Sequence, residues 1–144
     1  MATTFQVVFD THDPDRQAGF WAAVLGYKLQ APPEGFASWD EALRAWGIPE
    51  ERWNDATAIV DPEGVRPRLY FQRVPERKVA KNRLHLDVNV GGGTASFAER
   101  KARVDAEVTR LIALGATNER GAMERDDEYW VRMNDPEGNE FCVQ

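Results

Sequence analysis

Side chains that could transfer protons or bind a ligand alternate with apolar side chains between residues 83 and 90. The apolar set is Leu84, Leu86 and Val88, and the polar set is His85, Asp87 and Asn89. Such alternation is typical of a strand with one buried face, which places the polar residues together on the other face. A histidine near a carboxylate suits general acid–base chemistry, so His85 and Asp87 are the best catalytic candidates. The simpler interpretation of His85 is a hydrogen-bonded histidine in a pocket wall.

Polar residues of other predicted strands extend this set. In the predicted strand from Thr4 to Asp10, Phe5, Val7 and Phe9 would face a helix and leave Gln6 and Asp10 on the other face. Cys142 is the single cysteine, so no intramolecular disulfide can form, and we expect a small buried residue rather than a nucleophile. Strand alternation thus groups Gln6 and Asp10 with His85 and Asp87 as candidate pocket residues.

The first half of the chain contains clear start and stop signals for the elements that would position these residues. Asp13 and Pro14 predict the start of a helix that ends at Gly26. Ser38 and Glu41 predict a capping box for an inserted helix, at about residues 36–47. Further strands are expected at Tyr27–Gln30, Ala56–Val60 and Arg68–Val74.

The second half repeats the order of elements seen in the first. It predicts a helix at about residues 97–114, with Val104, Val108, Leu111 and Ile112 on one face. Strands are expected at residues 83–90, 117–123, Glu128–Met133 and Asn139–Val143, with an exposed hairpin turn within residues 124–128. The turn Asp61-Pro62-Glu63-Gly64 recurs as Asp135-Pro136-Glu137-Gly138, and Leu-Gly pairs end both long helices. We therefore predict an internal duplication of one βαβββ unit.

The duplication predicts an α+β fold in one domain, residues 1–144. Module one would span about residues 1–77 and module two about residues 78–144. Their sheets would curl around a shared small-molecule pocket.

The composition favours a single globular domain without a nucleic-acid or membrane partner. Hydrophobic residues make up 42% and charged residues 29% of the 144 residues, as in globular proteins. A formal net charge of −6 disfavours nucleic acid and anionic membrane surfaces. The first residues, MATTFQVVFD, lack a signal-peptide pattern, and no apolar run is long enough to span a bilayer. We expect a cytoplasmic protein.

Three segments together resemble the glyoxalase/bleomycin-resistance/dioxygenase superfamily, also called vicinal oxygen chelate proteins, and within it the glyoxalase-like domain branch. The segments are VVFDTHDPDRQAGFWAAVLGYKL, LYFQRVPERKVAKNRLHLDV and NDPEGNEFCVQ. The resemblance covers nearly the whole chain except residues 31–55. It implies two paired βαβββ modules whose curved, mostly antiparallel sheets surround a shared cleft. It also implies a small-molecule ligand and, as in many members, a homodimer. It leaves the activity open, because isomerases, dioxygenases and metal-free antibiotic-binding proteins share this scaffold.

In the metalloenzymes of this superfamily, four ligands come from the first and last strands of each module. The resemblance places these positions at Gln6, His85, Cys142 and Gln72, with Tyr70 as the alternative to Gln72. Together with the strand alternation, it predicts a ligand-binding pocket lined by Gln6, Asp10, Gln72, His85, Asp87 and Cys142. This set lacks the carboxylates that hard divalent ions prefer, and for zinc it lacks a third strong ligand. We therefore expect no cofactor, without excluding a divalent metal. A ring-cleaving dioxygenase is disfavoured, because the chain has only two histidines.

Two other groups of residues have open interpretations. Trp39 and Trp46 lie in the inserted helix and could form an aromatic lid that stacks on a ligand, although packing against the sheet edge is the simpler interpretation. The crossover from Arg73 to Arg83 is rich in arginine and lysine and could attract an anion, although a solvated linker is the simpler interpretation.

Three hypotheses for the function follow. The leading one is a metal-independent glyoxalase-like protein that binds, and could convert, a small organic molecule. The second is a non-catalytic protein that sequesters a cationic antibiotic or metabolite through acidic charge and tryptophans. The third is a divergent metal-dependent lyase or isomerase.

Overall fold

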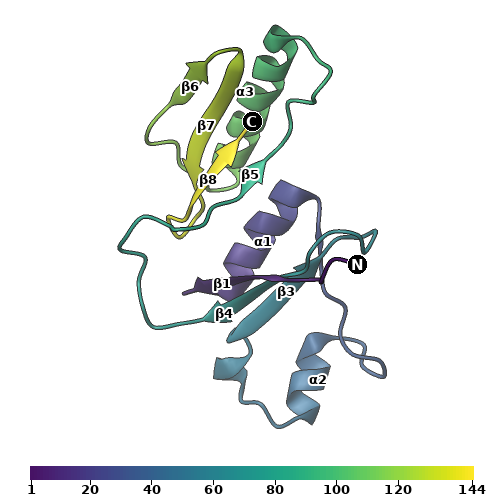
Figure 1. Ribbon diagram of the computed structural model, residues 1–144. Coiled ribbons are helices and arrows are strands. Elements are labelled where there is room, and N and C mark those ends of the chain that lie inside the picture. The colour runs from purple at the N-terminus through teal and green to yellow at the C-terminus, as the bar shows by residue number, and fades with distance from the viewer. The chain divides into compact units, whose positions relative to one another are not determined.

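A computed structural model describes residues 1–144, which divide into two compact units, Met1–Arg77 and Lys78–Gln144. Each unit has a sheet of four strands with its long helix packed against it (Figure 1). We describe each unit by itself. Unit 1 contains β1 (Val7–Thr11), α1 (Pro14–Leu25), β2 (Lys28–Leu29), α2 (Trp39–Ala45), a 3-10 turn η1 (Glu50–Arg52), β3 (Ala56–Val60) and β4 (Leu69–Arg73).

Unit 2 repeats this order without the inserted helix. Its elements are β5 (Asp87–Val88), α3 (Phe97–Ala113), β6 (Ala122–Arg125), β7 (Glu128–Asn134) and β8 (Glu140–Val143). The strand order is β1-β4-β3-β2 in unit 1 and β5-β8-β7-β6 in unit 2. In each unit the first and last strands pair in parallel and the remaining pairs are antiparallel. The predicted α+β fold of two βαβββ units with mostly antiparallel sheets is therefore confirmed.

The helix ends follow from short-range capping. The Asp13 carboxylate accepts a hydrogen bond from the Arg16 amide at 3.2 Å, and Gly26 ends α1 with a φ of 69°, as the sequence predicted. At α2 only half of the predicted capping box forms. The Ser38 hydroxyl accepts from the Glu41 amide, but the Glu41 carboxylate accepts from the Ala37 amide instead of that of Ser38. The complete capping box starts α3.

Each unit has its own apolar core between its sheet and its long helix. In unit 1, Phe71 is fully buried on β4, and its ring stacks on Phe9 at 5.1 Å between centroids. Phe9 also contacts Trp21 of α1 at 5.3 Å. In unit 2, Leu111 of α3 and Phe141 of β8 are buried. Because Phe9 and Phe141 point to the helix, their neighbours along each strand point away from it.

Two parts of unit 2 differ from the sequence prediction. The strand expected at residues 83–90 is only Asp87–Val88, and Leu84 is 72% exposed instead of facing the helix. At this end the Asn82 amide donates to the side-chain carboxylate of Glu140, and β8 bonds the chain before β5 through the Cys142 amide, which donates to the Leu86 carbonyl. The strand expected at 117–123 begins only at Ala122, after an isolated bridge from Thr117 to Asn134.

The apolar face of α3 is narrower than predicted. Val104, Val108 and Leu111 are buried and form the apolar stripe. Ile112 follows Leu111 in the sequence and lies at the edge of this stripe, so it is half-exposed. No helix in the structure is long and apolar enough to cross a membrane.

Candidate functional site

The sheet of unit 2 turns a row of polar side chains away from α3. In the strand register, Asp87 pairs with Cys142, and Cys142 pairs with Arg132. Paired residues share a face of the sheet, so these three side chains lie in a row across β5, β8 and β7. The intervening residues, such as Val131 and Val143, are buried on the other face. The row is the framework of the candidate site.

His85 lies just before β5, next to this row. Its Nε2 atom is 3.3 Å from Oδ1 of Asp87, within ion-pair distance, and both side chains are a little under half exposed. Donor atoms of His85, Asp87 and Cys142 all lie within 4.8 Å of one another. The structure thus brings together three of the six residues that the sequence predicted for a pocket. An imidazole next to a carboxylate and open to solvent can exchange protons with a ligand.

The thiol of Cys142 is held in its neutral form. Desolvation by burial raises its pKa, and the charge of Asp87 and a hydrogen bond with that carboxylate raise it further. A thiol with a raised pKa is a poor nucleophile, since the thiolate is the reactive form. In the absence of a metal, Cys142 therefore contributes a polar surface to the site and not a reactive sulfur.

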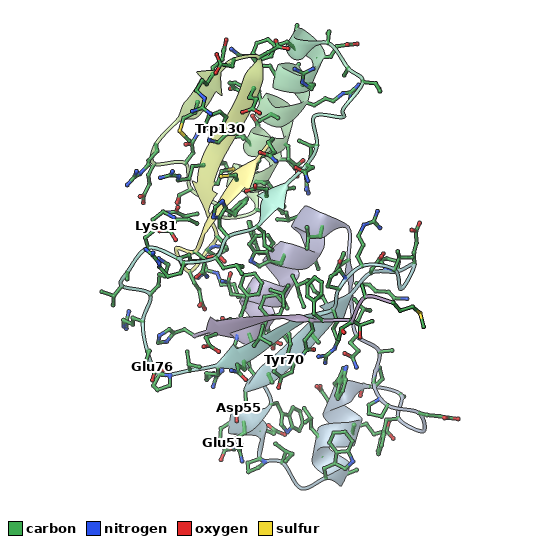
Figure 2. The ribbon with its side chains drawn as sticks, in the orientation of Figure 1. Glu51, Asp55, Tyr70, Glu76, Lys81 and Trp130 are labelled. Carbon is green, nitrogen blue, oxygen red and sulfur yellow. The ribbon has the colours of Figure 1, made fainter.

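A small cavity of about 30 Å³ lies along this row. It adjoins a larger cavity of about 110 Å³, because Lys81, Arg132 and Glu140 line both. The remaining lining residues of the smaller cavity are His85, Phe141 and Cys142. Figure 2 shows Lys81 near the turn between β7 and β8.

Glu140 remains ionised at the rim of these cavities. Its carboxylate lies 3.1 Å from the Lys78 ammonium and accepts a hydrogen bond from the Asn82 amide at 3.0 Å. Desolvation raises the pKa of Glu140, but these two interactions outweigh it and bring the pKa to about 2. The negative charge of Glu140 is thus largely matched by Lys78.

The corresponding face of unit 1 carries the other predicted residues, already engaged with one another. The Gln72 amide donates to Asp10 Oδ1 at 2.7 Å, and Gln6 Oε1 accepts from Arg68 at 2.7 Å. The amide of Gln144 donates to Asn89 in unit 2 at 2.9 Å, so the Gln72–Asp10 pair has a counterpart. Gln6, Asp10 and Gln72 therefore form pairs within unit 1, and their role in a pocket stays a prediction.

This counterpart aligns the two units residue by residue. If Gln72 matches Gln144, then Tyr70 matches Cys142, since each lies two residues earlier on the last strand. The antiparallel pairs agree with this alignment. Ala58, which pairs with Tyr70, lies three residues before Asp61. Arg132, which pairs with Cys142, lies three residues before Asp135. In this alignment Tyr70 is the counterpart of Cys142, and the choice between Gln72 and Tyr70 as the fourth metal-equivalent position stays a prediction.

The structure supplies the third strong donor for a metal that the sequence did not identify. Asp87 lies beside His85 and Cys142, so that an imidazole nitrogen, a carboxylate oxygen and a sulfur converge within unit 2. This donor set fits a borderline ion such as Zn²⁺, which accepts three protein ligands and keeps a fourth position open. A metal would have to displace the thiol proton of Cys142 on binding, and the raised pKa of this thiol makes that displacement more costly.

The tryptophans of the inserted segment pack on one another. The rings of Trp39 and Trp46 lie edge to face at 6.4 Å, and Phe36 contacts Trp46 at 5.8 Å. The Trp39 indole donates to the Gln30 carbonyl at 2.7 Å, which fixes its ring beside β2. Trp46 is 51% exposed. The cluster thus combines fixed packing at Trp39 with an exposed ring at Trp46, and its role as a lid stays a prediction.

Arg132 and Arg120 are site residues that the sequence analysis missed. Arg132 could have been found from the turn at Asp135–Gly138. Arg132 lies three residues before this turn and Cys142 four residues after it, and these positions face each other in a hairpin. Arg120 could not, because it lies in the irregular segment before β6.

A family model described as "Glyoxalase-like domain" matches residues 6–144. Among curated proteins, no sequence matches the chain.

Several solved structures have the same fold. A glyoxalase/bleomycin resistance protein/dioxygenase family enzyme from Burkholderia phytofirmans has a TM-score of 0.62 and 18% identity, covering 96% of this chain and 94% of that chain. A lactoylglutathione lyase from Agrobacterium tumefaciens has a TM-score of 0.56 and 17% identity, covering 99% and 92%.

A mutant of the fosfomycin resistance protein FosX from Listeria monocytogenes, complexed with Mn(II) and 1S,2S-dihydroxypropylphosphonic acid, has a TM-score of 0.61 and 10% identity. The match covers 100% of this chain and 90% of that one. At these identities the likeness shows the fold alone.

Proposed function

Because the chain belongs to the glyoxalase-like domain family, within the glyoxalase/bleomycin resistance/dioxygenase superfamily, we propose that it binds a small organic molecule at the polar face of unit 2 and transfers a proton there. The observation that carries this proposal is the convergence of His85, Asp87 and Cys142 within 4.8 Å. The proposed site works with the side chains of the protein itself, without a metal.

His85 is the proposed general base. Asp87 lies 3.3 Å from its Nε2 atom, so the carboxylate can orient the imidazole and stabilise the imidazolium that forms when His85 accepts a proton. The proton would leave a carbon next to a carbonyl group. The C–H electron pair would form a C=C bond while the π pair of the carbonyl moves to its oxygen, and return of the proton from His85 to that oxygen would give the enol isomer. The neutral Cys142 thiol contributes a wall of the site.

A thermal-shift screen of metabolites tests this proposal, since a ligand that prefers the folded state raises the melting temperature. We expect His85→Ala and Asp87→Asn to remove most of the shift produced by the best ligand. His12→Ala is the matched control, because His12 is the other histidine and lies outside this cluster. An unchanged shift in both site variants would exclude this pocket.

The same three donors support a second candidate function, a divergent metal-dependent lyase or isomerase. His85, Asp87 and Cys142 would hold the ion, which would supply Lewis-acid polarisation of a substrate oxygen. Elemental analysis of the purified protein separates the two candidates. One tightly held metal per chain, lost in Cys142→Ser, would favour the metalloenzyme, whereas a metal-free protein that retains its ligand response would favour the first proposal.

A homodimer is part of the proposal, by analogy with the superfamily. Light scattering on the full chain measures the mass directly, against 16.3 kDa for one chain. A mass of one chain at all concentrations would exclude it.

A further inference from the structure

The larger cavity of unit 2 carries an excess of positive charge. Its volume is about 110 Å³, and it opens at the end of the sheet where β7 turns into β8. It is lined by Lys81, Glu119, Arg120, Arg132, Asn134 and Glu140. The whole chain has a formal net charge of −6, so the three cations around this small cavity make its local charge opposite in sign to that of the chain.

None of these three cations has an acidic partner. Lys81, Arg120 and Arg132 form no ion pair within 4.0 Å of a carboxylate. Glu140, the one carboxylate of β8, also lines the cavity, but Lys78 and the Asn82 amide already bind it. Glu119 lines the cavity without forming an ion pair. The cations therefore retain charge and donors for a group from outside the chain.

The position of Arg132 makes this charge more than a solvated surface feature. Arg132 is half-buried in the middle of β7, on the same row as Cys142 and Asp87. An arginine that loses part of its hydration without gaining a carboxylate is costly, unless a ligand supplies the anion. The planar guanidinium donates two parallel hydrogen bonds to a carboxylate or phosphoryl group, and the Asn134 amide beside it offers a further donor.

We propose that this cavity binds an anionic group, a carboxylate or a phosphoryl group, of the small molecule whose reacting part lies at His85 and Asp87. The inference rests on the proposed function for the position of the reacting part, and on the cavity itself for the charge of the ligand. The two parts are continuous, because Lys81 and Arg132 line the cavity that also contains His85 and Cys142. The substrate class is therefore a small organic acid or phosphate ester with an acidic carbon nearby.

The crossover between the two halves of the sequence has a role in this site. The sequence leaves its basic residues open between attraction of an anion and a solvated linker, and Arg77 and Arg83 are exposed. Lys78 and Lys81, however, lie at β8, where one neutralises Glu140 and the other lines the cavity. The loop thus delivers positive charge to the sheet of unit 2.

Titration of the full chain with inorganic phosphate and, separately, with acetate tests the inference. Binding is monitored by the chemical shifts of the backbone amides at constant ionic strength. We expect saturable shifts at Arg132 and Cys142 with at least one of the two anions. Loss of one charged hydrogen bond in Arg132→Gln should weaken binding about ten-fold, and Lys81→Gln should weaken it as well. The preferred anion distinguishes an organic acid from a phosphate ester.

Arg125→Gln is the matched control, since Arg125 is an exposed cation on the β6–β7 hairpin, outside the cavity. It should leave both affinities unchanged. Lys81 lies outside regular secondary structure, so its variant reports on charge even if Arg132→Gln loses stability. Absence of saturation with both anions, or equal weakening by Arg125→Gln, would overturn the anion site.

The outcome also separates this inference from the proposed function. If phosphate or acetate binds through Arg132 while His85→Ala leaves every screened ligand unaffected, the proton-transfer site is wrong and the anion site stands. If ligands depend on His85 but carry no anionic group and tolerate Arg132→Gln, the anion site is wrong and the proposed function stands.

Discussion

Tyr70 in unit 1 occupies the register position that Cys142 occupies in unit 2. Both residues lie on the last strand of their unit, on the face turned away from the long helix. Their parallel-strand partners are Val8 and Asp87, so the equivalent cross-strand pairs are apolar in unit 1 and polar in unit 2.

The next strand extends this difference. Tyr70 pairs with Ala58, whereas Cys142 pairs with Arg132. Figure 2 labels Tyr70 on β4, where Arg68 lies over its ring at 5.1 Å. The duplicated sheets thus differ at equivalent positions, because unit 2 has Asp87 and Arg132 where unit 1 has Val8 and Ala58. This asymmetry is the reason why we assign the chemistry to unit 2.

Tyr129 should titrate at unusually high pH. Desolvation raises its pKa to about 12, together with a hydrogen bond to Asp105 at 2.5 Å. A raised pKa means that the folded state is favoured below the ordinary tyrosine value of 10.0 and loses this contribution as the pH rises toward 12. Ultraviolet titration should show one of the three tyrosines ionising last, and Tyr129→Phe should remove that step. Persistence of the step in the variant would contradict the assignment.

Asp61 should make the stability sensitive to acid. Hydrogen bonds from the amides of Arg66, Glu63 and Val65 hold its pKa below the ordinary 3.8. A lowered pKa contributes stability above the ordinary value, which is lost as the pH falls through the folded-state value. Urea unfolding at several pH values should show a shallower acid dependence for Asp61→Asn. Asp126→Asn, at an exposed hairpin position, should behave like the wild type. Equal slopes in all three proteins would refute this role.

Phe71 should dominate the core of unit 1. It is fully buried and stacks on Phe9, so truncation to alanine removes the ring and leaves a cavity. We expect Phe71→Ala to lower the free energy of unfolding by about 3–5 kcal/mol. Phe5→Ala is the control: the Phe5 side chain is 70% exposed, so the change should be within about 0.5 kcal/mol. Urea denaturation measures both, and similar losses would show that the core is assigned incorrectly.

Substitution of Trp46 distinguishes a ligand-binding lid from a tryptophan cluster that only packs on itself. Since Trp46 contacts Trp39 and Phe36 edge to face, we expect Trp46→Ala to leave the affinity of a ligand bound at His85 unchanged. The measurement is calorimetric binding at low and high salt. A large loss of affinity for a cationic ligand, with binding that weakens in salt and no turnover, would instead support the sequestering protein.

The elements of this fold could be predicted well where signals are local. The Asp13–Pro14 start and the Gly26 end of α1 were read correctly, because capping depends on neighbouring residues alone. The strand at 83–90 was overestimated, because alternation does not reveal how many partners β8 provides.

The site was predictable only in part. His85, Asp87 and Cys142 could be named from strand alternation and the resemblance, but their convergence depends on the parallel pairing of β5 with β8. Arg120 and Lys81 lie in irregular segments, and no periodicity indicates where such segments cross a sheet. Long-range pairing and loop paths therefore set the limit of the sequence prediction.

The most direct test of the central claim compares His85→Ala with Gln6→Ala, since these residues occupy equivalent positions in the two units. The measurement is the dissociation constant of the best screened ligand by calorimetry, with melting temperatures to verify folding. The account predicts a loss of about ten-fold or more for His85→Ala, as expected for a charged hydrogen bond, and little change for Gln6→Ala. The reverse result, a large loss for Gln6→Ala with His85→Ala unaffected, would contradict the assignment of the chemistry to unit 2.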